Sequence, residues 1–210
     1  WKSSKYRQPL LLKGARQVGK TYLLKSFGEE EFPNYQYFNF EDNKRLSSFF
    51  EPDLDPLRIL NELSLSKGVK IDIERDLLIF DEIQNCPKAL TSLKYFSETL
   101  PQVHLTCAES HMGLLFMEGS FPVGKIDELH LYPMNFEEFL LSNNKLAYET
   151  FQKSKEPLSL TPFEHQILWK YLTQFYIVGG MPDSVKQFKE SGGNYLQCRE
   201  YQKKLLGQYL

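Results

Sequence analysis

The chain has 210 residues, 41% of them hydrophobic and 25% charged, a balance typical of a globular protein with one sizeable core and room for a small second domain. The formal net charge is −2, so the composition gives no indication of nucleic-acid or membrane binding. No apolar run approaches the roughly 20 residues of a membrane-spanning helix, and no signal peptide is visible.

The cysteines and histidines exclude two further classes of protein. Cys86, Cys107 and Cys198 are far apart and odd in number, so they predict neither a disulfide framework nor a zinc site, and we expect a cytoplasmic protein. The four histidines include no pair at metal-binding spacing. Because the chain starts at Trp1 without a methionine and ends inside a helical pattern, we expect a piece of a longer protein.

The first predicted elements are a buried strand over 9–13 and a helix over 22–27 that ends at Gly28. Between them the sequence reads G-x-x-x-x-G-K-T, the pattern of a phosphate-binding loop. A loop of this kind surrounds phosphates with backbone N–H groups, and the following helix adds its dipole. We expect ATP or ADP to be bound by Gly14, Ala15, Arg16, Gln17, Val18, Gly19, Lys20, Thr21 and Tyr22.

Two side chains of this loop have predicted chemical roles. Lys20 places an ammonium against the β- and γ-phosphates, and Thr21 offers a hydroxyl to the accompanying Mg²⁺. The alternative interpretation is a glycine-rich turn with a solvated lysine.

Strand and helix patterns then alternate along the chain. The predicted strands cover 35–40, 76–82, 103–108 and 128–132, and the predicted helices begin at Pro56, Pro87 and Asn135. Tyr35 and Tyr37 are interpreted as core residues of a strand. Alternating strands and helices predict an α/β fold, a three-layer αβα core of the P-loop nucleotide-hydrolase type with a parallel sheet.

Two carboxylates follow the apolar strand that ends near residue 80. Asp81 is the expected acidic partner of Mg²⁺, and Glu82 is placed to orient and deprotonate a water aimed at the γ-phosphate. The alternative is a solvated pair of carboxylates at a turn. Ser110 is the first candidate for a polar sensor after the next strand, and Thr106 is the second. That strand is expected to lie between the loop strand and the Asp81 strand.

No strand pattern follows Ser142, so we divide the chain into a core over 1–142 and a small all-helical lid domain over 143–210. Thr161 and Glu164 form a capping-box pattern that opens a long helix. The sequence Gly-Gly-Met-Pro ends this helix at Pro182, and further helices are expected from about 183 and 194. We expect a hinge near 142–144.

The chain resembles the bacterial and archaeal AAA-type ATPases near the STAND class of signalling ATPases. The resemblance rests on motifs spread along the chain: Gly14–Thr21, Asn39–Glu41, Leu78–Gln84, Ser92–Phe96, Ser120–Lys125, Tyr132–Leu140 and Gly179–Pro182. It implies an ATP-binding core and a helical lid whose Pro182 packs on the adenine, with a C-terminal effector domain missing. A plain helix break is the alternative for Pro182. Glu109 and Lys125 depart from the family, which commonly has Gly and Arg there.

The sequence therefore predicts Mg²⁺-dependent ATP binding and hydrolysis, with Lys20, Glu82 and Ser110 as catalytic residues. A nucleotide-gated interaction switch with little turnover is the alternative, and a phosphotransferase is disfavoured by Glu82. Beyond ATP, the candidate partners are a protein or a second copy of the chain, bound through the lid or the missing C-terminal domain.

Overall fold

The structure, a computed structural model, describes residues 1–4, 6–110, 124–154 and 160–207. The chain divides into two compact units, Trp1–Leu131 and Tyr132–Leu210. Among the described residues, every strand belongs to the first unit and the second unit contains helices without strands. No helix in the described part of the chain is both long and apolar enough to cross a membrane.

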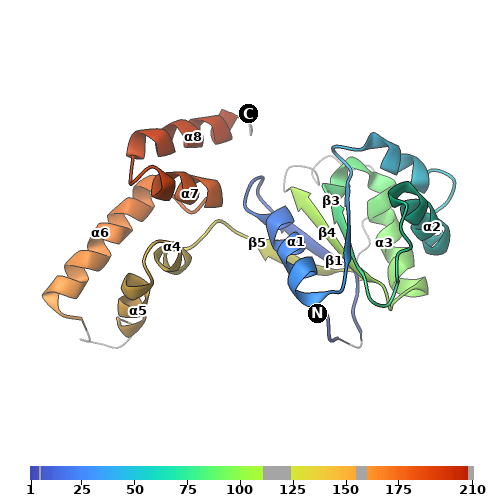
Figure 1. Ribbon diagram of the computed structural model, residues 1–210, viewed down its shortest axis with the longest axis horizontal. Coiled ribbons are helices and arrows are strands. Elements are labelled where there is room, and N and C mark those ends of the chain that lie inside the picture. Colours follow the sequence, from blue (N-terminus) through green and yellow to red (C-terminus); the bar gives the residue numbers. More distant parts are fainter. Residues whose placement is uncertain (5, 111–123, 155–159, 208–210) are drawn as a thin grey trace. The chain divides into compact units, whose positions relative to one another are not determined.

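The first unit is built on a five-stranded sheet. Its strands lie close to the predicted ranges: β1 (Leu10–Gly14), β2 (Tyr35–Asn39), β3 (Leu77–Asp81), β4 (His104–Ser110) and β5 (Asp127–Leu131). The strand order is β2-β3-β4-β1-β5 and every pair is parallel. Figure 1 labels β1, β3, β4 and β5 of this sheet. β4 therefore lies between β1 and β3, which confirms the predicted position of the strand that ends at Ser110.

Helices cover both faces of this sheet (Figure 1). Side chains alternate between the faces along a strand, so Leu11 packs with the cluster of α2 (Pro56–Lys67) and α3 (Pro87–Thr99). Its neighbour Leu12 packs with the cluster of α1 (Lys20–Glu31) on the other face. The predicted three-layer αβα fold is thus confirmed. Two short 3₁₀ helices, η1 (Lys44–Phe50) and η2 (Ile83–Asn85), lie in the connections that follow β2 and β3.

The prediction that the first helix ends at Gly28 is wrong, because α1 continues to Glu31. Gly28 is buried in the helix, and a Cβ there would lie 2.8 Å from the Cγ atom of Tyr35. The glycine is therefore explained by the close approach of β2 and not by a helix end.

The described part of the second unit contains the helices α4 (Phe136–Asn143), α5 (Lys145–Lys153), α6 (Pro162–Val178), α7 (Pro182–Glu190) and α8 (Tyr195–Gly207), of which α6 is the predicted long helix. Thr161 forms the predicted capping box with Glu164, and Asn135, where a helix was predicted to begin, forms one with Glu138. The helix α5 was not predicted. Asn144 caps it by accepting a hydrogen bond from the backbone N–H of Ala147 at 3.0 Å.

The division between the units falls earlier in the chain than the expected boundary near residue 142. The reason is that α4 is buried in the helical unit, since Phe139 packs with Val178 and Phe188, and Leu140 with Leu168. The stretch 142–144, expected as a hinge, joins two packed helices and contains the N-cap of α5. The helical unit therefore begins at Tyr132.

The Gly-Gly-Met-Pro sequence forms the turn between α6 and α7. Gly179 has φ 73°, and a Cβ on Gly180 would lie 2.0 Å from the carbonyl oxygen of Met134. The N–H of Met134 donates to the carbonyl of Gly180 at 2.7 Å, so this turn lies against the segment that precedes α4. Pro182 occupies the first turn of α7, where a missing N–H has no cost.

Candidate functional site

The predicted phosphate loop connects the carboxyl end of β1 with the N-terminus of α1. Gly14 is the last residue of β1 and Lys20 is the first of α1. β1 lies between β4 and β5, so the loop follows an internal strand. Gly19 caps α1 without a side-chain hydrogen bond, and the first turn has no acidic residue. The backbone N–H groups in the first turn of α1, at the positive end of the helix dipole, are therefore suited to bind an anion.

Two residues give the loop its backbone shape. Gly19 has φ 104° and Gln17 has φ 61°, both in the left-handed region. Gln17 is not a glycine, so this conformation is strained, and the spacing pattern did not indicate it. At Gly14 the reason for a glycine is steric, since a Cβ there would lie 2.3 Å from the carbonyl oxygen of Leu131. The glycine at this position permits the close approach of β5.

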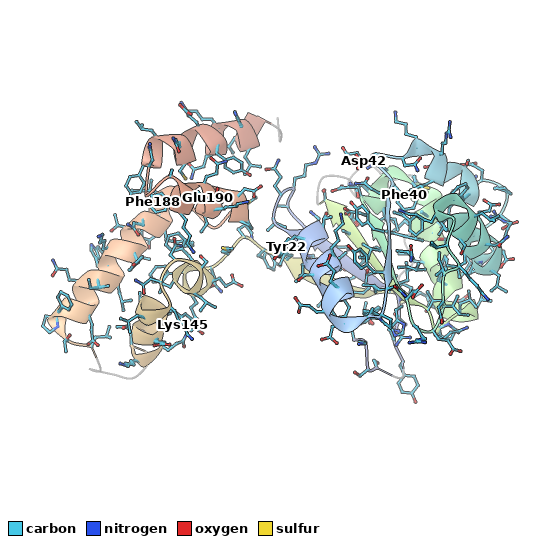
Figure 2. All side chains as sticks on the ribbon, viewed as in Figure 1. Tyr22, Phe40, Asp42, Lys145, Phe188 and Glu190 are labelled. Atoms are coloured by element: carbon cyan, nitrogen blue, oxygen red, sulfur yellow. The ribbon has the colours of Figure 1, made fainter. Side chains whose placement is uncertain are left out.

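The other predicted loop residues differ in exposure. Val18 is buried and anchors the loop, Ala15 is half-buried, and the side chain of Arg16 is exposed. Tyr22 lies in the first turn of α1 with its side chain 78% exposed (Figure 2). Its backbone N–H is therefore the group that we expect to face a phosphate.

Lys20 is buried beneath the loop. Its ammonium donates to the carbonyl oxygens of Gly14 at 3.0 Å and Ala15 at 2.8 Å. Desolvation by burial lowers the pKa of Lys20, while the nearby carboxylates, Glu82 first among them, oppose this effect. The ammonium is thus already desolvated and is held by two neutral carbonyls, which a phosphate oxygen could replace with a stronger, charge-assisted bond.

Thr21 and Asp81 meet at the carboxyl end of β3. The hydroxyl of Thr21 donates to Oδ2 of Asp81 at 2.7 Å, although 60 positions separate them in the sequence. The two predicted metal ligands are therefore neighbours in the fold.

This pair suits Mg²⁺. A hydroxyl and a carboxylate supply hard oxygen ligands, and Mg²⁺ usually takes one or two protein oxygens beside water and phosphate. No group of three or more His, Cys, Asp or Glu residues in the described part of the chain could form a protein-only metal site. Thr21 and Asp81 are therefore the residues that would hold Mg²⁺ with a bound nucleotide.

Glu82 directly follows β3 and has a left-handed backbone with φ 51°. Its carboxylate accepts hydrogen bonds from Ser110 at 2.9 and 3.0 Å and from the amide of Gln84. A non-glycine residue in this conformation carries strain, which is common at functional sites. The two donors hold the carboxylate at the edge of the sheet where the phosphate loop also lies.

Ser110, the first sensor candidate, ends β4 and is buried. Its contact with Glu82 joins the ends of β4 and β3. Thr106, the second candidate, lies within β4 and donates to the carbonyl of Leu78 at 3.0 Å. The hydroxyl of Thr106 therefore bonds to the sheet itself, and Ser110 is the better candidate.

Tyr37, which was expected to be a core residue, also lies at this site and was not predicted from the sequence. Its hydroxyl donates to Oδ2 of Asp81 at 2.7 Å. Burial, followed by this hydrogen bond, raises the pKa of Tyr37, so the phenol stays a neutral donor. The strand pairing explains the contact, because Asn39 of β2 lies opposite Asp81 and Tyr37 shares its face two residues earlier, and this pairing is not contained in the local sequence.

A family model described as "AAA domain" matches residues 6–140, a range that includes the phosphate loop, Asp81, Glu82 and Ser110. The chain belongs to the AAA domain family. Residues 6–140 therefore form a AAA-type P-loop ATPase domain. A comparison with curated protein sequences gives no match.

Several solved structures resemble this AAA domain. The structure of C. elegans PCH-2 has 12% identity and a TM-score of 0.47, covering 84% of this chain and 52% of that one. AMPPCP-bound DnaA from Aquifex aeolicus has 15% identity and a TM-score of 0.45, covering 88% and 54%. Drosophila ORC bound to DNA has 17% identity and a TM-score of 0.44, covering 90% and 55%. The chain thus spans about half the length of each.

The structure describes both residues that depart from the family pattern, Glu109 and Lys125. Glu109 is buried and lies opposite Lys13 of β1, so by strand alternation it faces away from Ser110, whose contact with Glu82 is retained. The pKa of Glu109 is raised to about 7, mainly because the carboxyl group is buried. Lys125 pairs with Glu98 of the same chain at 3.1 Å.

Pro182 belongs to the helical unit, whereas the loop of the AAA domain belongs to the first unit. Its place in the first turn of α7 is explained by the local turn. The predicted contact with adenine therefore stays a prediction.

Proposed function

We propose that this chain binds Mg·ATP and hydrolyses it to ADP and phosphate. One observation carries the proposal: Lys20, the Thr21–Asp81 pair and the Glu82–Ser110 pair lie at the carboxyl ends of three adjacent strands, β1, β3 and β4. In open α/β sheets, this edge is where ligands bind.

The proposed division of roles follows the chemistry of each group. The loop N–H groups and Lys20 bind the phosphates, and Thr21 and Asp81 hold Mg²⁺. The metal ion, when bound, neutralises charge on the β- and γ-phosphates. Ser110 reports the γ-phosphate through its contact with Glu82.

Glu82 is the proposed base. A carboxylate has about four lone-pair sites, so the two donors Ser110 and Gln84 leave a lone pair of Oε1 that could accept from a water. A water held there would be oriented by Glu82 for attack on the γ-phosphate and would transfer its proton to the carboxylate.

The alternative function is a nucleotide-gated switch with little turnover. The same contacts favour it, because both oxygens of the Glu82 carboxylate already accept from Ser110, and Oε2 also accepts from Gln84, so the carboxylate is engaged within the protein. The resemblance to STAND ATPases supports a signalling role of this kind, in which the nucleotide state is coupled to movement of the helical unit and to a protein partner.

Phosphate release measured with Mg·ATP, beside a sample with EDTA, tests the proposed function. We expect several turnovers per chain with Mg²⁺ and none with EDTA. Fewer than one turnover with ADP retained would support the switch. Failure to bind nucleotide at all would overturn both functions.

We further propose that Pro182 contacts the adenine, so we expect Pro182→Gly to weaken ADP and ATP binding alike. Loss of one apolar contact with the base corresponds to about 1 kcal/mol, or about fivefold in affinity. Pyrophosphate lacks the base and should bind unchanged. Calorimetric titrations with ADP and pyrophosphate measure both affinities.

The matched control is Pro162→Gly, because Pro162 occupies the same first-turn position in α6 of the same unit. It should leave both affinities unchanged. An equal loss for ADP and pyrophosphate in Pro182→Gly, or a loss for neither, would show that the turn is only a helix break.

A further inference from the structure

We propose that Tyr37 is a positioning residue for the metal-binding carboxylate of Asp81 and thereby sets the affinity of the nucleotide site for Mg²⁺. The inference rests on the proposed function, because it assumes that Asp81 serves Mg²⁺. It adds a residue from β2, which contributes no group to the site predicted from the sequence.

The carboxylate of Asp81 is held by three donors. Oδ2 accepts from the hydroxyls of Thr21 and Tyr37, each at 2.7 Å, and Oδ1 accepts from the N–H of Glu82 at 3.1 Å. Because both carboxylate oxygens accept hydrogen bonds, the carboxylate of Asp81 is held in one orientation. Outer partners of this kind orient metal ligands and contribute to metal affinity.

The direction of the Tyr37 hydrogen bond follows from its other neighbour. The side-chain oxygen of Asn39 accepts from the N–H groups of Glu41 at 2.7 Å and Asp42 at 3.0 Å. This assigns the amide orientation, so the Asn39 nitrogen donates to the Tyr37 oxygen at 3.2 Å. The phenolic hydrogen is therefore directed to Asp81.

The Tyr37 ring is held from the helix side as well. The ammonium of Lys25 lies 3.8 Å from its ring centroid, in cation–π geometry, and Lys25 belongs to the helix that starts at the phosphate loop. The ring also packs against the hydrophobic cluster beneath α1. Phenylalanine would keep these ring contacts and remove the hydrogen bond to Asp81, so Tyr37→Phe isolates the hydroxyl.

The test measures binding of the β,γ-methylene analogue of ATP, which is not hydrolysed, over a series of Mg²⁺ concentrations and in EDTA. For Tyr37→Phe we expect the Mg²⁺ concentration at half-maximal effect to rise about fivefold. Mutation of a hydrogen-bond partner of a metal ligand typically lowers metal affinity at least tenfold. We expect a smaller effect here, because Thr21 and the N–H of Glu82 still hold Asp81. The affinity in EDTA should stay within about twofold of wild type.

Tyr35→Phe is the matched control, since Tyr35 lies two residues earlier on β2 and its hydroxyl donates to Glu29 at 3.1 Å. It should change neither quantity, and thermal unfolding should show both variants folded. An unchanged Mg²⁺ dependence in Tyr37→Phe would overturn the proposal. An equal loss of affinity for the analogue with and without Mg²⁺ would overturn it as well. If binding of the analogue by the wild type does not depend on Mg²⁺, the metal dependence of the proposed function is wrong as well. This outcome differs from a wild type that depends on Mg²⁺ and a Tyr37→Phe variant with the same dependence, so the two failures are distinguishable.

Discussion

Replacing Lys20 by alanine is expected to weaken the affinity for Mg·ATP at least tenfold. The ammonium of Lys20 is buried and bonded to the carbonyl oxygens of Gly14 and Ala15, so its desolvation has already occurred before a phosphate arrives. Alanine removes a charge-assisted bond to the β- and γ-phosphates, and such bonds contribute about 1.5–3 kcal/mol each. Calorimetric titration with Mg·ATP measures the loss.

The control is Lys94→Ala, which removes a charge from α3 while leaving the phosphate loop intact. We expect it to bind Mg·ATP as the wild type does. Thermal unfolding of Lys20→Ala separates a binding defect from a folding defect, because the two loop carbonyls lose their donor in this variant. Unchanged affinity in a folded Lys20→Ala variant would remove Lys20 from the nucleotide site.

Glu82→Gln is expected to bind Mg·ATP and to hydrolyse it more slowly, by a factor on the order of 10², or about 2.7 kcal/mol in activation free energy. Glutamine keeps the shape of the side chain and an oxygen that accepts from Ser110, but it cannot accept a proton from water. Phosphate release measures the rate, and calorimetry measures the affinity.

Glu30→Gln is the control for this variant, because Glu30 lies on the exposed side of α1 and accepts from Ser26 at 2.8 Å. It removes one carboxylate without touching the site and should hydrolyse at the wild-type rate. Wild-type turnover in Glu82→Gln would mean that another group orients the water. A wild type that retains ADP after less than one turnover would support the switch instead.

Several features of this protein were predictable because they depend on residues close together in the sequence. The loop from Gly14 to Thr21 is one contiguous motif whose spacing specifies the turn, the lysine and the hydroxyl. The caps at Asn135 and Thr161 are local as well, since each bonds to a residue three positions later. The confirmed parallel sheet followed from the alternation of strands and helices.

Other predictions failed because local patterns have several explanations. Gly28 was interpreted as a helix end, whereas it makes room for Tyr35 across the connection to β2. The polar stretch 142–144 was interpreted as a hinge, but the burial of Phe139 against α6 and α7 places α4 within the helical unit. In both cases the competing explanation is a contact with residues from another element.

The sequence by itself determined the phosphate loop, the acidic end of β3 and the class of fold, because spacing and periodicity encode them locally. Only the tertiary structure decided that Tyr37 donates to Asp81 and that Ser110 donates to Glu82. These pairs depend on strand order, which brings the carboxyl ends of β2, β3 and β4 together. Strand order is a property of the whole packed sheet, so no single stretch of the sequence contains it.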